Sequence, residues 1–289
     1  MNLNYSNREL LAFTHIKKAA GTTLSHILRI NFFLKHCDVK VLSAASGNIF
    51  QAADMHKLLK LNPLIRSIAG HSVLPYGDLD QYYRKAKFIT ILRNPIKRYI
   101  SQYQHNVEKL GYKGSFETYL DDQSSWNKQV KTIAGSEDLN LAKDILIKKF
   151  LLVGIVEEFD TFLILLKMKL EPKNFYPGYK VQNIAKKDSA IGLKVEDYLK
   201  THEEKIEDRN ALDIALYQFV KSELLAKEKS LYGSGFETAL QDFKRSKKGY
   251  DRKVFWYLDY IVRKIYYQPR IHHIRKNNGL IKYRERGPA

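Results

Sequence analysis

The chain has 289 residues, of which 44% are hydrophobic and 28% are charged, and this composition is typical of a folded globular protein with a sizeable core. Lys and Arg outnumber Asp and Glu by 49 to 31, so the net charge of +18 favours an anionic partner whose identity it leaves open. Because Cys37 is the single cysteine, an intrachain disulfide and a cysteine-based zinc site are both excluded. We expect Cys37 to be an ordinary half-buried thiol.

The N-terminal residues lack the basic start and the apolar run of a signal peptide. No apolar stretch is as long as the about 18 residues that a transmembrane helix needs. If the chain is full length, we therefore expect it in the cytoplasm or at the cytoplasmic face of a membrane. A chain from which an upstream anchor had been removed would have the same sequence.

Short apolar runs alternate with helical patterns along most of the chain. The runs at 10–16, 66–70, 87–92 and 150–156 predict buried strands, and residues 22–33, 96–110 and 159–170 have the spacing of helices. Residues 111–149 and 195–230 have mainly helical patterns. Strands that alternate with helices predict an α/β fold with a central parallel sheet, whose loops gather at the carboxyl ends of the strands.

The last 47 residues differ from the rest. Between Phe243 and Ala289 there are 14 Lys and Arg against three acids, which supply +11 of the net charge, and residues 254–267 mix aromatic with basic side chains. We therefore predict a main domain at 1–242 and a basic, aromatic-rich helical extension at 243–289. The extension either docks on an anionic membrane surface or packs its aromatic face on the domain, and both can hold together.

The first predicted strand ends in a basic turn of small residues, His-Ile-Lys-Lys-Ala-Ala-Gly-Thr-Thr at 15–23. Unpaired backbone N–H groups and the positive end of a helix dipole meet in such a turn, so it predicts an anion cradle. Gly21 lets the backbone approach an oxyanion, and Lys18 adds a cation. The turn is not a Walker A loop, since its lysines precede the glycine. The plainer alternative is a tight strand-to-helix turn with two surface lysines.

A second basic turn follows the strand at 87–92, with the sequence Leu-Arg-Asn-Pro-Ile-Lys-Arg-Tyr-Ile-Ser at 92–101. Pro95 suits the first turn of a helix, where an N–H is not needed. Ser101 lies eight residues, or two helical turns, after Arg93. Arg93 and Ser101 are therefore candidates for holding a second phosphate.

The two turns together resemble the two cofactor motifs of carbohydrate sulfotransferases, similar to the uronyl and heparan sulfate 2-O-sulfotransferases. That family has His-Ile-Pro-Lys-Thr-Ala-Gly-Thr-Ser in the first motif and Leu-Arg-Asp-Pro-Val-x-Arg-Phe-x-Ser in the second. Segments 126–135, 152–157 and 210–217 look like the same family, so the resemblance spans residues 10 to 222 and leaves the basic extension uncovered. It implies a P-loop-like three-layer fold with helical insertions.

The resemblance also implies a function, namely transfer of a sulfuryl group from 3′-phosphoadenosine 5′-phosphosulfate (PAPS) to a hydroxyl of a carbohydrate acceptor, without a metal. In this sequence Lys18 matches the lysine that stabilises the leaving phosphate. The other residues expected to bind PAPS are Ala19, Ala20, Gly21, Thr22 and Thr23 at the 5′-phosphosulfate, and Arg93 and Ser101 at the 3′-phosphate. The chain departs from the family pattern at Lys17, Ala19 and Asn94, where the family has Pro, Thr and Asp.

Transfer to a hydroxyl needs a proton acceptor, and the pKa of a histidine suits that role. His71, in Ala-Gly-His-Ser at 69–72, looks like the histidine base of uronyl 2-O-type relatives, and the alternative is a structural histidine. His15 and His105 are weaker candidates for a direct role. Glu157 and Glu158 rank second as the base, because other sulfotransferase branches use a glutamate.

The acceptor is the least specified part of the prediction. The excess of positive charge suits an anionic glycan, although a solvated basic surface explains it equally. Asn127 and Gln129 match family positions and serve either as acceptor contacts or as loop braces. Two other classes stay open: a P-loop-like nucleotide phosphotransferase, and a non-enzymatic polyanion-binding protein. We expect no nucleic acid partner, and the oligomeric state is not predicted.

Overall fold

The computed structural model of the protein describes residues 9–170, 175–181, 190–246 and 253–280, and it divides into two compact units. Unit 1 consists of residues 1–15, 24–89 and 249–289, and unit 2 of residues 16–23 and 90–248. The chain enters unit 2 after His15 and after Ile89, and it returns to unit 1 after Thr23 and after Lys248.

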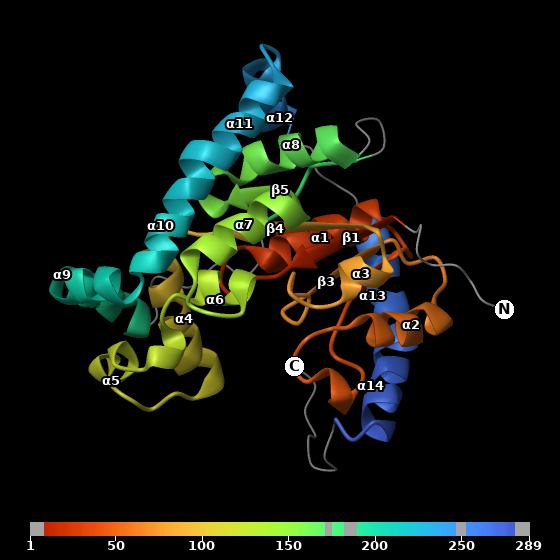
Figure 1. Ribbon diagram of the computed structural model, residues 1–289, viewed down its shortest axis with the longest axis horizontal. Coiled ribbons are helices and arrows are strands. Elements are labelled where there is room, and N and C mark those ends of the chain that lie inside the picture. Colours follow the sequence, from red (N-terminus) through yellow and green to blue (C-terminus); the bar gives the residue numbers. More distant parts are fainter. Residues whose placement is uncertain (1–8, 171–174, 182–189, 247–252, 281–289) are drawn as a thin grey trace. The chain divides into compact units, whose positions relative to one another are not determined.

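Five strands form one parallel sheet in the order β2-β3-β1-β4-β5 (Figure 1). Their bounds are β1 Glu9–Thr14, β2 His36–Asp38, β3 Ser67–Gly70, β4 Lys85–Leu92 and β5 Phe150–Ile155. In β1 every residue from Leu10 to Thr14 is buried, as expected for a parallel strand that is covered on both faces. The predicted fold class, an α/β protein with a central parallel sheet, is confirmed.

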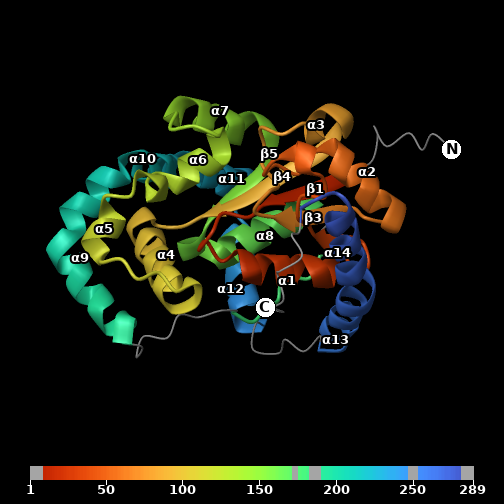
Figure 2. The same cartoon turned by 90° about the horizontal axis from the view of Figure 1, so that it is seen from below.

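Unit 1 holds β1, β2, β3 and the first part of β4, with helices from both ends of the chain. These are α1 Gly21–Asn31, whose first three residues belong to unit 2, α2 Ala52–Leu61, α3 Leu79–Tyr82, α13 Lys253–Val262, the π-helical turn η7 Arg263–Tyr267 and α14 Gln268–Asn277. A 3₁₀ turn, η2 Ala44–Ser46, precedes α2. The α13, η7 and α14 segments follow one another without a break and appear in blue in Figures 1 and 2.

Unit 2 holds the end of β4, β5 and most of the helices. They are α4 Pro95–Leu110, α5 Phe116–Leu120, η3 Gln123–Ser125, α6 Lys128–Ala134, α7 Leu139–Lys149, η4 Val156–Glu158, α8 Phe159–Leu170, α9 Ala190–Arg209, α10 Ala211–Phe219, η5 Val220–Leu224, α11 Leu225–Tyr232 and α12 Phe236–Ser246. The helices α4, α5 and α9 contact one another and are grouped together in Figure 2.

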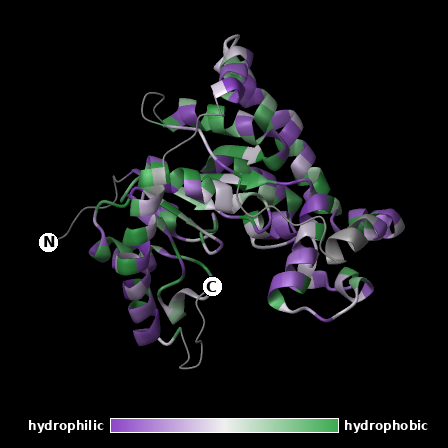
Figure 3. Cartoon of the chain, turned by 180° about the vertical axis from the view of Figure 1, so that it is seen from behind, coloured by the Kyte–Doolittle hydropathy of each residue, from purple (hydrophilic) through white to green (hydrophobic). Residues whose placement is uncertain are grey.

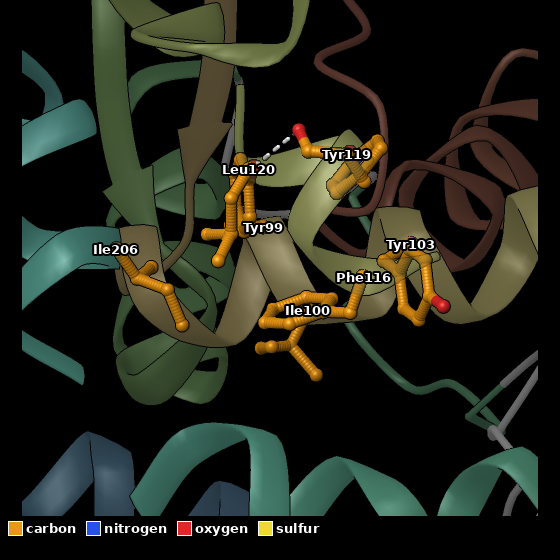
Figure 4. Packing of buried hydrophobic residues seen from close by; sticks show 7 residues of the cluster. All are labelled: Tyr99, Ile100, Tyr103, Phe116, Tyr119, Leu120 and Ile206. Carbon is orange, nitrogen blue, oxygen red and sulfur yellow. Dashed lines mark hydrogen bonds between the residues drawn. The ribbon is translucent and has the colours of Figure 1, made fainter. Parts of the chain in front are cut away.

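An aromatic cluster fixes α4 within unit 2 (Figure 4). Its buried members come from α4, α5 and α9 and are Tyr99, Ile100, Tyr103, Phe116, Tyr119, Leu120 and Ile206. The hydroxyl of Tyr99 donates a hydrogen bond of 2.9 Å to the carbonyl oxygen of Tyr119. Because aromatic pairs at these separations stabilise packing beyond the area that they bury, the cluster holds α4 in one orientation.

The elements predicted at the core of the sheet are confirmed, with small shifts of their ends. The first strand ends at Thr14 instead of Ile16, because the chain turns into the basic loop there. The strand β2 was not predicted, since it has only three residues and two of them are polar. The expected helices of the extension include α13 and α14, whereas residues 247–252 and 281–289 of the extension lie outside the described residues.

The boundary predicted between 242 and 243 stays a prediction, and α12 includes both of these residues. Within the described ranges, no helix has the length and apolar character needed to cross a lipid bilayer.

Candidate functional site

The loop between β1 and α1 has an unusual backbone. Lys18 and Ala20 adopt left-handed conformations, with φ of 67° and 55°, and α1 begins directly afterwards at Gly21. For residues with a Cβ this conformation costs on the order of 1–2 kcal/mol each. Left-handed residues that alternate with others turn successive N–H groups toward one side, which creates a concave anion site. The geometry therefore favours the anion cradle over a plain turn.

The side chains of this loop divide into buried and exposed ones. Ile16 and Ala19 are buried and anchor the loop, whereas Lys17 and Thr22 are exposed. Thr23 is 4% exposed and lies in the first turn of α1. The first turn of α1 contains no acidic residue that would neutralise the positive end of its dipole.

Arg93 binds this loop directly. Its Nη1 donates a hydrogen bond of 3.0 Å to the carbonyl oxygen of Lys18, so the two predicted motifs are joined in unit 2. Burial lowers the pKa of Arg93, Glu157 raises it and Arg98 lowers it further. The structure thus brings together two of the predicted cofactor residues, Lys18 and Arg93, that are 75 residues apart in the sequence.

Positive charge is concentrated around Lys18. Burial and then the Arg93 guanidinium lower the pKa of Lys18, while Glu108 opposes them. His105 also lies within the electrostatic influence of Lys18, because burial first and then the charge of Lys18 lower the pKa of His105. Cations that repel one another in a partly desolvated site are stabilised when an anion binds between them.

The second motif forms the start of α4. The Asn94 side chain accepts a hydrogen bond of 3.1 Å from Lys97 N, which caps the helix, and Pro95 occupies its first position as predicted. Asn94 replaces the aspartate of the family pattern and still performs the capping. Ser101 lies in the second turn of α4 and is half-buried.

Gln129 braces Arg93 and is itself held by Asp213, a residue that the sequence analysis did not single out. Gln129 N donates to both carboxylate oxygens of Asp213 over 3.0 Å, and Val130 N donates to Asp213 Oδ1 over 2.8 Å. The Gln129 side chain in turn exchanges two hydrogen bonds with the backbone of Arg93. Asn127 accepts a hydrogen bond of 3.2 Å from Asp213 N. These contacts identify Asn127 and Gln129 as braces of the loop after β4.

In unit 1, His71 lies beside His15. The register pairs Thr14 with Gly70, so the residues that follow them, His15 and His71, leave adjacent parallel strands at the same edge of the sheet. His71 Nδ1 is 2.7 Å from the carbonyl oxygen of His15, and the two ring centroids are 4.1 Å apart. A carbonyl oxygen only accepts, so Nδ1 carries a proton, and in the neutral ring Nε2 carries the basic lone pair.

The close approach of the chain at Gly70 helps to define this edge. A Cβ at position 70 would lie 2.6 Å from the backbone oxygen of Val39, so only glycine fits. His15 itself is unsuited to accept a proton, because burial and then His71 lower its pKa to about 3. This favours His71 over His15 as the base.

The other candidates make structural contacts. Glu157 accepts hydrogen bonds of 3.1 Å from both Asn94 N and the Tyr217 hydroxyl, and Glu158 pairs with Lys229 over 2.5 Å.

Cys37 is 5% exposed and so is fully buried, not half-buried as expected, because it lies in β2 of the sheet. The described parts of the chain contain no group of three His, Cys, Asp or Glu side chains placed to bind a metal ion.

No curated protein matches the chain significantly. Among solved structures, the chain is similar to a sulfotransferase from Alicyclobacillus acidocaldarius, with 15% identity and a TM-score of 0.38 over 73% of this chain and 96% of that one. The sequence model of the sulfotransferase family matches residues 1–163. This match includes both basic loops and more than half of the chain, which therefore belongs to the sulfotransferase family.

Proposed function

We propose that this protein transfers a sulfuryl group from PAPS to a hydroxyl of a carbohydrate acceptor. The observation that carries the proposal is the hydrogen bond from Arg93 to the backbone of Lys18, which unites the two basic loops. Sulfotransferases generally use PAPS as the donor. A single loop of this kind would fit many anions, whereas two joined loops suit a ligand with two separate phosphate groups.

The residues around Lys18 fit such a donor. The backbone of 18–23, Thr22 and Thr23 would hold the 5′-phosphosulfate, and Arg93 with Ser101 would hold the 3′-phosphate. The lowered pKa values of Lys18 and Arg93 support this assignment, because both cations are partly desolvated and an anion would restore the stability of their charged forms.

When bound, PAPS supplies the sulfuryl group: its bond from sulfur to the bridging phosphate oxygen breaks as the acceptor oxygen bonds to sulfur. Lys18 then stabilises the negative charge that develops on the departing phosphate oxygen. His71 Nε2 takes the proton of the acceptor hydroxyl, and the bond from His71 Nδ1 to the His15 carbonyl oxygen keeps Nε2 in its basic form.

A carbohydrate is the acceptor class that the resemblance of the two loops favours, and the net charge of +18 suits an anionic one. In the loop after β3, the exposed Tyr76 follows the exposed His71 by five residues. An exposed aromatic ring in this loop offers a surface against which the apolar face of a sugar can pack.

The first experiment measures the melting temperature of the protein with 3′-phosphoadenosine 5′-phosphate (PAP), using ATP, AMP and sulfate as controls. We expect stabilisation by PAP alone at equal concentrations. An equal shift with ATP would favour a nucleotide phosphotransferase, and a shift with every polyanion would favour a polyanion-binding protein.

The second experiment supplies PAPS with a labelled sulfuryl group to uronic-acid polysaccharides, neutral polysaccharides and small phenols. We expect label in a polysaccharide. Label in the phenols alone would contradict a carbohydrate acceptor and leave the sulfotransferase activity standing.

A further inference from the structure

The helical segment from Lys253 to Asn277 is bound to unit 1 along one side. The Phe255 ring meets the Phe33 ring of the chain after α1 edge to face, with centroids 5.6 Å apart. Tyr267 is 6% exposed and accepts a hydrogen bond from Asn62, and the Tyr266 hydroxyl donates one of 2.9 Å to Leu61 O. These contacts establish that the segment packs on unit 1.

The one acidic residue of this segment belongs to the packed side. Asp259 has a side chain that is 16% exposed and lies 3.8 Å from Arg263 Nε. Arg263 Nη1 also lies 3.8 Å from Asp38 of β2. Arg263 therefore attaches the segment to β2 through Asp38, and Asp259 pairs with Arg263 within the segment, so neither contributes much charge to the outer surface.

The outer side carries apolar side chains that contact water. Val254 and Ile265 are both 70% exposed, and Leu258 is 43% exposed. Their spacing of four and seven residues places them on one face of a helix. We call these three residues the outer stripe. Tyr257 and Tyr260 are also exposed, at 60% and 39%, and add aromatic rings.

Basic side chains accompany the outer stripe. Lys264, Arg270 and Lys276 are exposed, but Arg270 lies over the Tyr266 ring, 3.8 Å from its centroid, and lines a pocket with Leu61 on the packed side. Figure 3 shows α14 mostly in the purple of hydrophilic residues. Residues 253–280 contain six Lys and Arg, and Asp259 is the single acid among them. The exposed surface of this segment is thus both apolar and positively charged.

We propose that the outer stripe docks on an anionic lipid surface. Val254, Leu258 and Ile265 would enter the boundary between headgroups and acyl chains, while Lys264 and Lys276 would contact anionic headgroups. Tyrosine rings suit this boundary, since they have an apolar body and a polar tip. Such docking concerns a surface outside the two basic loops and goes beyond the proposed sulfuryl transfer.

Two other occupants fit the observations less well. A second copy that docks through the same segment would bring the same excess of basic side chains against this one, and residues 253–280 contain no exposed acid to neutralise it. An anionic polysaccharide would use the basic residues but would leave the outer stripe in water. A membrane with anionic lipids satisfies both properties at once.

The test is co-sedimentation of the full chain with vesicles of phosphatidylcholine, with and without phosphatidylglycerol. We expect binding only to the anionic vesicles and weakening by salt. Ile265→Gln should lower the partition coefficient between water and vesicles by roughly tenfold or more, because it removes an apolar side chain that moves from water into the membrane on binding. Lys264→Gln should lower it by roughly fivefold.

Two matched control variants lie in unit 2. Leu231, in α11, is 64% exposed, so Leu231→Gln makes the same kind of change outside the outer stripe. Lys227 is exposed in the same helix, so Lys227→Gln removes one positive charge there. Both controls should bind the anionic vesicles like the unaltered chain, and all variants should keep its circular dichroism spectrum and melting temperature, which shows that they are folded.

Several results would overturn the proposal. These are no sedimentation with anionic vesicles, equal sedimentation with neutral ones, or equal losses in the control variants. If the chain instead dimerises in solution and Ile265→Gln abolishes the dimer without any vesicle binding, the outer stripe is a contact between copies of the chain. None of these results alters the PAP experiment, so the two proposals fail independently.

Discussion

The side-chain amide of Gln129 makes two hydrogen bonds with the backbone of Arg93. Arg93 N donates to Gln129 Oε1 over 2.9 Å, and Gln129 Nε2 donates to Arg93 O over 2.9 Å. The two bonds use both the backbone N–H and the backbone C=O of Arg93. They therefore fix the end of β4 as backbone hydrogen bonds to a neighbouring strand would. The guanidinium that reaches Lys18 therefore starts from a fixed backbone.

Gln129→Leu should weaken PAP binding although Gln129 is not proposed to touch the ligand. Leucine keeps the volume but leaves the N–H and C=O of Arg93 without partners, which costs about 1–3 kcal/mol for a buried group. We expect a lower melting temperature and a higher Kd for PAP by calorimetry. Gln218→Leu, on the exposed side of α10, is the control. An unchanged Kd for PAP would show that Arg93 does not need this brace.

Asp213 should stabilise the fold through the start of α6. Asp213→Ala removes the acceptor of Gln129 N and Val130 N, and we expect the free energy of unfolding to fall by about 2 kcal/mol or more. Asp213→Asn keeps one oxygen and should lie between the two. Denaturant unfolding measures the effect, with Asp242→Ala on the exposed side of α12 as a control. Equal stabilities of the two alanine variants would contradict the role of Asp213.

The parts of the site predicted from the sequence are those that depend on local pattern. Apolar runs followed by basic turns marked the ends of β1 and β4, and Pro95 marked the start of α4. Parallel strands bring such turns to the same edge of a sheet, which is why the two loops could be expected to meet. The hydrogen bond from Arg93 to Lys18 has that origin.

The parts that were missed depend on contacts between distant residues. Asp213 lies 84 residues from Gln129, and no periodicity of either segment signals their pairing. The left-handed Lys18 and Ala20 could not be expected either, because that conformation is usually a property of glycine. For Asp213, a buried acid within an otherwise apolar helix, in Ala-Leu-Asp-Ile at 211–214, was the available signal.

The affinity for PAP should fall as the pH rises from about 7 to about 10, because the charged form of Lys18 is the binding form. Burial and Arg93 lower the pKa of Lys18, so its proton is lost at a lower pH than that of an ordinary lysine. Above this pKa, Lys18 must take up a proton when PAP binds. The requirement raises the Kd for PAP by up to about tenfold per pH unit.

Titration calorimetry across this pH range tests the prediction. Lys18→Arg should bind PAP with a nearly constant Kd, since a guanidinium stays protonated. Lys227→Arg, in α11, should keep the fall of the unaltered chain. A constant Kd for the unaltered chain would place the phosphates away from Lys18.

His71→Ala should keep PAP binding and lose about 10²–10⁴ of turnover, the usual contribution of a general base. The measurement compares kcat with the active acceptor and the Kd for PAP. Added imidazole should restore part of the rate, which a merely structural role of His71 would not predict. His272→Ala is the control on an exposed histidine of α14. Full turnover of His71→Ala would transfer the role to another residue, with Glu157 and Glu158 the next to test.

His15 should make the fold sensitive to acid. Its folded-state pKa of about 3 lies below the 6.5 of an unfolded histidine, so the unfolded chain binds more protons between these values. Stability therefore falls as the pH drops through this window, and His15 accounts for up to about 2 kcal/mol of the loss at about pH 5. His15→Gln should reduce the difference between the unfolding free energies at about pH 7 and about pH 5 by that amount. The same difference in both chains, measured by urea unfolding, would mean that His15 becomes protonated without leaving its place beside His71.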